Sequence, residues 1–332
     1  MATAMTPPAH AQDFLTRCGW AGARIEPLAG DASFRRYFRV SDGRRTAVLM
    51  DAPPPQEDVR PFVAVAEWLH SVGLSAPEII GRDIERGLLL LGDFGSWRLR
   101  EVVDEDPSRE RQLYELATDV LIHLHRHAPM PGLPVHGLDQ WLEELALFTE
   151  WYCPAVGLSV DVDSYRSAWS QVLEPFAADG LGPVTVLRDY HAENVMLVSG
   201  REGVRHFGLL DFQDALAGHP AYDLASVLED ARRDVPPDLE RAMIDRYVAE
   251  MGNGETFERA YWALAAQRNT RILGVFTRLW KRDNKPHYTA FQPRMWGLLE
   301  RDLAKPGLEP VRRWFDSNVK PEHRAAPWAE AA

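Results

Sequence analysis

The hydrophobic pattern of this 332-residue chain changes its period near residue 92. Before that point, residues 34–50 and 77–93 each have the pattern of two strands joined by a short polar turn. Between them, apolar residues recur at helical spacing over residues 62–72. Beyond residue 92 helical spacing dominates, as over residues 113–124. We therefore predict an α+β fold, with a small β-rich lobe followed by a larger, mainly helical lobe.

Within the helical part, one stretch has a different hydrophobic pattern. Between residues 184 and 212, the short apolar runs TVL, VML and FGLL alternate with polar turns. Helices are expected around it, near residues 141–151, 222–232, 237–251 and 256–282. We interpret the stretch as a short β insert within the large lobe.

Composition excludes several classes of protein. The net charge of -12 at pH 7 argues against a broad nucleic-acid interface, which normally requires a basic domain. No stretch approaches the roughly 18 apolar residues of a membrane span, and Cys18 and Cys153 show no metal-type spacing. We expect a cytoplasmic monomer with reduced cysteines and no nucleic-acid or membrane partner.

Three oxygen-bearing side chains stand out within the β insert. Asp189 and Asn194 lie five positions apart in the loop LRDYHAEN, and Asp211 ends the next apolar run, FGLLD. Carboxylate and amide oxygens suit Mg²⁺, and a further carboxylate can accept a proton from an attacking hydroxyl. Asp and Asn are also ordinary turn formers, and each residue taken alone has that simpler interpretation.

Taken together, these segments resemble a known family. LRDYHAEN is similar to the catalytic loop shared by protein kinases and the aminoglycoside phosphotransferase and choline kinase group. GLLDFQD resembles their metal-binding segment, and PAYDLAS resembles the motif that follows it. The resemblance implies a bilobal, protein-kinase-like fold whose cofactors are ATP and Mg²⁺. It implies that Asp189 is the catalytic base, that Asn194 and Asp211 hold the metal, and that Asp223 supports the catalytic loop.

The same resemblance assigns a role to each lobe. Residues 1–92 correspond to the nucleotide-binding lobe and residues 93–332 to the catalytic and substrate-binding lobe, with a hinge at about residues 90–95. Asp93-Phe94-Gly95 spells a kinase metal motif, but no catalytic loop precedes it. We therefore place Leu91 and Asp93 in the hinge, facing the adenine. A simple turn at the end of a strand explains the same residues.

One familiar phosphate contact is missing. The strand lysine that reaches the ATP phosphates in kinases corresponds here to Met50, and the first lysine of the chain is Lys281. Its partner glutamate corresponds to Phe62, with Glu67 only a turn or more later. We expect the segment around Ser33, Phe34, Arg35 and Arg36 to contact the phosphates, with one of the two arginines pointing into the cleft. The alternative is a solvated strand face.

Four segments narrow the resemblance further. They are GDASFRRYFRV, MDAPPPQEDVRPFV, LLDFQDALAGHPAYDL and RILGVFTRLWKRDNKPHY. They resemble the anomeric kinases that phosphorylate N-acetylmuramate and N-acetylglucosamine at C1 in cell-wall recycling, a subgroup that also lacks the strand lysine. This implies an ATP-dependent kinase that forms an amino-sugar 1-phosphate.

Candidates for contacting the acceptor lie in the large lobe. Arg268, Arg271, Arg278 and Arg282 share one face of a predicted helix, and a carboxylate such as the lactyl group of N-acetylmuramate can bind there. Surface ion pairs are the alternative, which we favour for Arg278 and Arg282. The substrate-binding residues that we predict are His191, Gln213, Arg268, Arg271 and Trp280.

Two other functions remain open on the sequence. A kinase for an aminoglycoside, choline or homoserine would use the same motifs. A nucleotide-binding pseudoenzyme that serves as a scaffold would be expected to lack at least one of Asp189, Asn194 and Asp211, and all three are present.

Overall fold

The structure is a computed structural model that describes residues 5–28 and 34–324. The chain divides into two compact units. The first unit runs to Glu105 and also includes Glu193–Asp214, and the second comprises Asp106–Ala192 and the residues from Ala215 onward. This division differs from the predicted boundary after residue 92 in two places.

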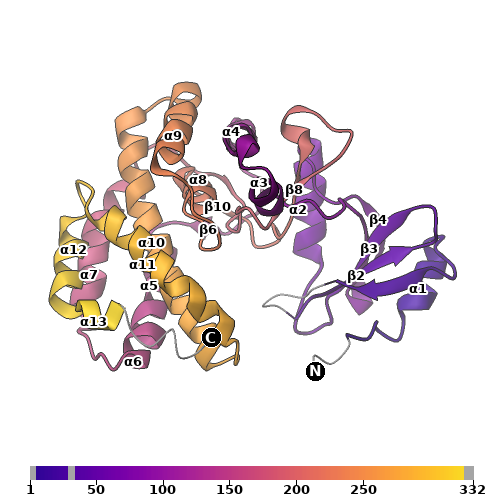
Figure 1. Cartoon of the computed structure of the whole chain (residues 1–332), viewed down its shortest axis with the longest axis horizontal. Coiled ribbons are helices and arrows are strands. Elements are labelled where there is room, and N and C mark those ends of the chain that lie inside the picture. The colour runs from indigo at the N-terminus through magenta and orange to yellow at the C-terminus, as the bar shows by residue number, and fades with distance from the viewer. Residues whose placement is uncertain (1–4, 29–33, 325–332) are drawn as a thin grey trace. The chain divides into compact units, whose positions relative to one another are not determined.

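The first unit is built on a five-stranded antiparallel sheet in the order β1-β2-β3-β5-β4 (Figure 1). Its strands are β1 Arg24–Pro27, β2 Arg36–Ser41, β3 Thr46–Asp51, β4 Ile79–Asp83 and β5 Leu88–Gly92. Strands β2 and β3 form the first predicted hairpin, and β4 and β5 form the second. Strand β1 was not predicted, because its four residues RIEP show no apolar alternation.

The two faces of this sheet have different partners. Phe38, Val40 and Leu49 point to one face, where they form a core with residues of helix α1 Ala11–Arg17. The intervening residues of β2, among them Tyr37 and Arg39, point to the opposite face because side chains alternate along a strand. By the strand register, that opposite face also carries the apolar residues Val48, Met50, Leu89 and Leu91.

Helix α2 Arg60–Ser71 and a third hairpin complete the first unit, together with helix α3 Leu99–Glu105. The hairpin consists of β8 Val195–Leu197 and β9 Phe207–Leu209. The amide of Leu209 donates to the Ser75 carbonyl at 2.8 Å, and the amide of Leu197 donates to the Trp97 carbonyl at 2.8 Å. These bonds join the hairpin to the first unit. The predicted β insert is therefore divided, because its first strand belongs to the second unit.

The second unit is mainly helical. Its longer helices are α4 Glu110–His125, α5 Leu138–Leu147, α7 Val162–Leu173, α8 Ala221–Leu228, α9 Pro237–Met251, α10 Gly254–Lys281, α11 Gln292–Leu303 and α12 Glu309–Asn318. The remaining helical segments are short, and they include the π-helix Phe148–Tyr152 that continues α5. Strands β6 Val135–His136, β10 Leu216–Gly218 and β7 Val184–Val186 form a small sheet in that order.

The predicted α+β class is confirmed, and the prediction for α9 matches its observed bounds. Helices α11 and α12 were not predicted. Each carries proline in its first turn, where the missing N–H costs no helical hydrogen bond, so a residue that usually interrupts a helix marks its start. Within the described residues, no helix is both long enough and apolar enough to cross a membrane.

Candidate active site

The predicted catalytic loop lies between β7 and β8, with Asp189 at the end of a tight turn. The Asp189 amide donates to the Leu187 carbonyl at 2.9 Å, and the His191 amide donates to the Asp189 carbonyl at 3.1 Å. Arg188 lies between Leu187 and Asp189 and has a φ of 73°, a left-handed backbone conformation that is unfavourable for residues other than glycine. A loop held in such a conformation needs support from its surroundings.

Asp223 provides that support from the first turn of α8. Its carboxylate accepts hydrogen bonds from the Leu187 amide at 2.6 Å and from the Arg188 amide at 2.9 Å. The side chain is fully buried, and burial, helped by the nearby charge of Asp189, raises the pKa of Asp223 to about 7 against the pull of the two amides. This geometry is the one that the predicted supporting role requires.

Asn194 and Asp211 lie at the same end of the β8–β9 hairpin. Val195 pairs with Leu209, and the Leu210 amide donates to the Asn194 carbonyl at 2.9 Å. Asp211 follows Leu210 with a φ of 56°, and Gln213 Nε2 donates to its Oδ1 at 2.9 Å. The hairpin thus brings together two of the predicted metal-site residues and Gln213 within the first unit.

The donor set of this hairpin fits magnesium. It offers one carboxylate and one amide, both hard oxygen donors, which is what Mg²⁺ usually takes from a protein when phosphate oxygens supply further ligands. No group of three or more His, Cys, Asp or Glu side chains arranged to hold a metal occurs in residues 5–28 and 34–324.

Arg35 and Arg36 have different surroundings. Arg36, the first residue of β2, donates from Nε to the Asp51 carboxylate at 2.8 Å and from Nη1 to the Thr6 carbonyl at 3.2 Å. Arg35 lies 3.6 Å from Glu57 and 3.9 Å from Asp214, three residues after the predicted metal ligand. Of these two arginines, Arg35 is therefore the one that lies near the segment containing Asp211.

The phenol of Tyr37 is influenced by the charge of Arg35 and by that of Asp211, the predicted metal ligand. Burial raises the pKa of Tyr37, the positive charge of Arg35 opposes the rise, and the negative charges of Asp211 and Glu57 reinforce it. All three charges thus act on one phenol, which places them in one neighbourhood. Phe34 is exposed, and its amide donates to Glu57 at 3.3 Å. Ser33 lies outside the described residues.

The positions of the missing kinase ion pair are apolar. Met50 is buried on β3, and Phe62 on α2 packs against Phe212 with ring centroids 4.8 Å apart. Phe212 directly follows Asp211, so an aromatic contact stands where a charged pair would act. Glu67 points to the surface, where it pairs with Arg82 at 3.4 Å. Removing both charges avoids the cost of burying either one alone.

The predicted hinge is held by hydrogen bonds from one arginine side chain. Arg39, on the face of the sheet opposite α1, donates to the Asp93 carboxylate at 2.9 and 3.3 Å and to the Gly95 carbonyl at 2.9 Å. Leu91 pairs with Val48 of β3 on one side and with Ile79 of β4 on the other. Asp93 therefore lies just past the strand end, whereas Leu91 is an interior residue of the sheet.

In the second unit, the predicted acceptor residues differ in accessibility. Arg268 is buried and donates to the Glu229 carbonyl at 3.3 Å. Arg271 is less buried and lies 3.6 Å from Glu144. Burial opposes the charge of Arg271, but neighbouring groups that include Tyr222, Glu144 and Asp189 raise its pKa. The charge of Asp189 thus acts on Arg271.

The end of α10 is more exposed. Arg282 pairs with Asp283 at 2.7 Å, the surface pairing that we favoured. Burial and the neighbouring Arg282 and Arg271 lower the pKa of Arg278. The Lys281 ammonium lies 3.5 Å from the ring centroid of Trp280, so a cation covers part of the aromatic surface that was predicted to hold a sugar.

Glu144 was not predicted and is the main addition to the candidate site. It is buried on α5 and accepts a hydrogen bond from Arg188 Nη2 at 2.8 Å. The signal was present in the sequence, since Glu144 stands three residues after Trp141 and four before Phe148, both of them buried. A carboxylate on the apolar face of a helix needs a buried cationic partner.

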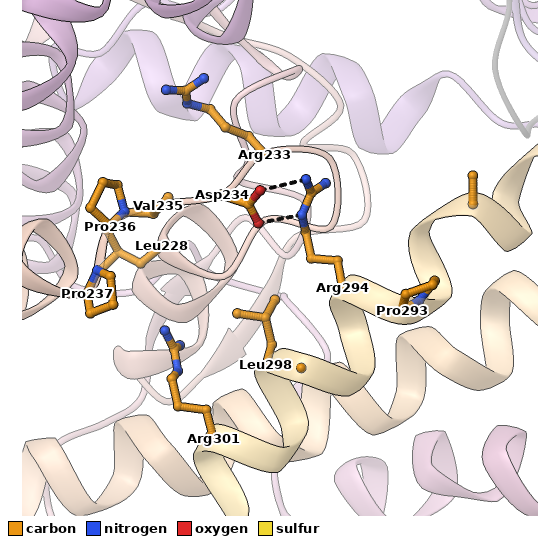
Figure 2. A pocket seen from close by; sticks show the side chains of 12 residues that line it. Leu228, Arg233, Asp234, Val235, Pro236, Pro237, Pro293, Arg294, Leu298 and Arg301 are labelled. Atoms are coloured by element: carbon orange, nitrogen blue, oxygen red, sulfur yellow. Dashed lines mark hydrogen bonds and ion pairs between the residues drawn. The ribbon is translucent and has the colours of Figure 1, made fainter. Parts of the chain in front are cut away.

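Elsewhere in the second unit, a cavity of about 690 Å³ lies between the loop after α8 and helix α11 (Figure 2). Its three arginines are each paired with a carboxylate: Arg233 with Glu110, Arg294 with Asp234 and Arg301 with Glu229. None of the predicted site residues lines it. We therefore assign it no part in the candidate active site.

Comparison with known proteins identifies similar chains and folds. An N-acetylmuramate/N-acetylglucosamine kinase of Caulobacter vibrioides is 37% identical, with 94% of this chain and 96% of that protein aligned. A protein of the same name from Pseudomonas aeruginosa is 36% identical, with 86% and 87% aligned.

Solved structures with much lower sequence identity share the fold. A choline/ethanolamine kinase family protein from Mesorhizobium loti matches with a TM-score of 0.65 at 15% identity, over 92% of this chain and 97% of that one. An ADP-bound aminoglycoside phosphotransferase matches with a TM-score of 0.62 at 15% identity, over 92% and 99%. The protein-kinase-like fold implied by the sequence motifs is thus confirmed.

The family model named phosphotransferase enzyme family matches residues 24–262. That range contains the strands of the first unit, the catalytic loop and the β8–β9 hairpin. With the close relatives aligned along most of its length, the chain belongs to the phosphotransferase enzyme family.

Proposed function

We propose that this protein is an ATP- and Mg²⁺-dependent kinase for the anomeric hydroxyl of N-acetylmuramate or N-acetylglucosamine, and that it forms the sugar 1-phosphate. The observation that carries the proposal is the similarity to relatives of that name along nearly the whole chain, at 37% identity for the Caulobacter protein. The candidate base and metal residues are all present in the matching segments.

In the proposed reaction, Asp189 accepts a hydrogen bond from the C1 hydroxyl and takes its proton as the oxygen attacks the γ-phosphorus. The bond between that phosphorus and the β–γ bridging oxygen breaks, and ADP leaves. Asp223 keeps Asp189 in position through the two amides that it binds at 2.6 and 2.9 Å. His191, two residues after Asp189, is proposed to contact the sugar.

The first unit supplies the groups for the nucleotide. Asn194 and Asp211 would hold Mg²⁺, which when bound neutralises charge on the β- and γ-phosphates. Arg35 takes the role of the missing strand lysine, because Arg36 is already held by Asp51. The adenine is assigned to the hinge around Leu91 and Asp93, where Arg39 fixes the Asp93 carboxylate.

The acceptor sugar is assigned to residues on or near α10 and to Gln213. Arg271 is the favoured partner for the lactyl carboxylate of N-acetylmuramate, since Arg268 is buried and bonded to the Glu229 carbonyl. Trp280 stays a candidate for stacking on the sugar. We further propose that the enzyme acts in the cytoplasm, as a monomer, in the recycling of cell-wall amino sugars.

The acceptor can be tested directly. Purified protein with ATP and Mg²⁺ would be offered N-acetylmuramate, N-acetylglucosamine, glucose and kanamycin, and the position of the phosphate would be read by ³¹P and ¹H NMR. We expect an amino-sugar 1-phosphate from the first two and little turnover of the others. A phosphate at any carbon other than C1, or preferential turnover of kanamycin, would contradict the proposal.

A further inference from the structure

We propose that Glu144 sets the charge selectivity of the acceptor site: it holds Arg188 and Arg271 and cancels part of their positive charge, so that neutral N-acetylglucosamine is accepted beside anionic N-acetylmuramate. This inference rests on the proposed function. Glu144 would act through the two arginines and is therefore a positioning residue, with no direct contact to the reacting atoms.

The contacts of Glu144 are shared between its two carboxylate oxygens. Oε1 accepts from Arg188 Nη2 at 2.8 Å. Oε2 lies 3.4 Å from His136 Nε2, 3.4 Å from Gln267 Nε2 and 3.6 Å from Arg271 Nε. The distance from Glu144 to Arg271 Nε is that of an ion pair without a hydrogen bond.

The His136 ring adds no full charge to this group. Its Nδ1 accepts a hydrogen bond from Trp141 Nε1 at 3.3 Å, which is possible only in the neutral ring. In that tautomer Nε2 carries the proton and points it at Glu144. Among the groups in direct contact with Glu144, two arginines therefore face one carboxylate, and the next negative charge that acts on Arg271 is that of Asp189.

A close approach of two helices makes this arrangement possible. A Cβ atom on Gly274 of α10 would lie 2.4 Å from the Leu147 carbonyl carbon at the end of α5, so only glycine fits there. Arg271 precedes Gly274 by three residues, and Glu144 precedes Leu147 by three, so both lie about one turn from the contact. The glycine contact thus brings Arg271 to Glu144 across 127 residues of sequence.

Each of the two arginines is related to Asp189, one through the chain and the other through its charge. Arg188 is its neighbour in the chain and adopts the left-handed conformation of the loop, with φ at 73°. The charge of Asp189 is among those that raise the pKa of Arg271. An acceptor placed for attack at Asp189 therefore lies near the charge of Arg271, which Glu144 partly neutralises, and beside the residue Arg188 that Glu144 holds.

The consequence for the sugar follows from Coulomb's law. Replacing Glu144 by glutamine leaves both guanidinium charges without their counter-charge, which favours an acceptor that carries its own carboxylate. At distances of several ångströms and a protein-like dielectric, one unit of charge changes binding on the order of tenfold or more. The binding of a neutral acceptor is not strengthened by the substitution. Arg188 also loses the hydrogen bond to Glu144 that orients its side chain.

The test compares two sugars within each variant. We would measure kcat/KM for N-acetylmuramate and for N-acetylglucosamine with the full chain, and divide the first by the second. This ratio does not depend on the fraction of protein that is folded. For Glu144→Gln we expect the ratio to rise about tenfold over wild type, mainly through KM. For Arg271→Gln we expect it to fall, and this variant tests the proposal even if Glu144→Gln is insoluble.

Matched controls separate charge from structure. Glu143→Gln removes the same charge from the neighbouring exposed position on α5 and should leave the ratio unchanged. Glu144→Asp retains the charge and should retain a ratio near that of wild type, even if turnover falls. Ratios within twofold of wild type in both Glu144→Gln and Arg271→Gln would overturn the proposal. If wild-type protein phosphorylates neither sugar, the proposed function itself fails and this inference fails with it.

Discussion

Arginines near the candidate site residues are held differently in the two units. In the first unit, Arg36 and Arg39 each have a carboxylate at hydrogen-bond distance, supplied by Asp51 and Asp93 respectively. In the second unit, the single buried carboxylate of Glu144 faces both Arg188 and Arg271. Pairs of one arginine and one carboxylate leave little net charge, whereas the shared carboxylate leaves positive charge beside the candidate base.

The difference suggests how each unit treats its ligand. Under the proposed function, the nucleotide would reach the first unit with Mg²⁺, which offsets part of its negative charge. An amino sugar brings one negative charge or none, and a modest positive excess in the second unit can then decide between substrates. The following experiments are ordered by the size of the expected effect, and each tests one side of this comparison.

The largest effect is expected from Asp189→Asn in the second unit. Loss of the proton acceptor should reduce kcat about a thousandfold, while ATP binding, which depends on the first unit, stays within about threefold of wild type. A coupled or discontinuous activity assay would measure kcat, and calorimetric titration with ATP would measure nucleotide affinity. Asp163→Asn, an exposed carboxylate in the first turn of α7, serves as the control. Near-normal turnover in Asp189→Asn would refute the assignment of the base.

The next effect concerns stability in acid. Although burial of Glu144 opposes ionisation, its contacts with His136, Arg271 and Arg188 lower its pKa from 4.5 to about 2. A carboxylate with a depressed pKa stabilises the fold above its unfolded pKa and loses that contribution as pH falls through the folded value. We expect wild type to lose roughly 3 kcal/mol from this group between about pH 5 and pH 2.

The matching measurement is urea unfolding of wild type and Glu144→Gln across that pH range. The stability difference between the two proteins should shrink as pH falls, because glutamine does not titrate. Glu143→Gln, which lacks buried partners, should follow wild type throughout. A constant difference between wild type and Glu144→Gln would show that the carboxylate does not depend on the neighbouring cations.

A smaller effect should distinguish the two arginines of the first unit. Arg35→Ala is expected to raise the KM for ATP about tenfold to a hundredfold, the cost of losing one charge-assisted phosphate contact. Arg36→Ala should change that KM less than threefold and instead lower the free energy of unfolding by about 1–3 kcal/mol, because Asp51 is buried and loses its partner. Steady-state kinetics and urea unfolding would measure both variants, and equal KM changes would contradict the assignment.

The sequence was most informative where function depends on local segments. Asp189, Asn194 and Asp211 were predicted as site residues because short loops and strand ends carry them in a characteristic order. The hairpins of the first unit were predicted because strand alternation and turn residues are local signals. The choice between Arg35 and Arg36 stayed open, since it depends on Asp51 and Glu57, whose positions follow from strand register and loop path.

Glu144 marks the opposite case. Nothing near it in the chain shows that it meets Arg188 and Arg271, because the meeting depends on the backbone approach of α5 and α10 at Gly274. The division of the β insert is similar, since hydrogen bonds to Ser75 and Trp97 place β8 and β9 in the first unit. Chemical identity and local conformation are written in short stretches of residues, but the charge that surrounds a site is the sum of side chains from distant stretches, and packing alone brings those together.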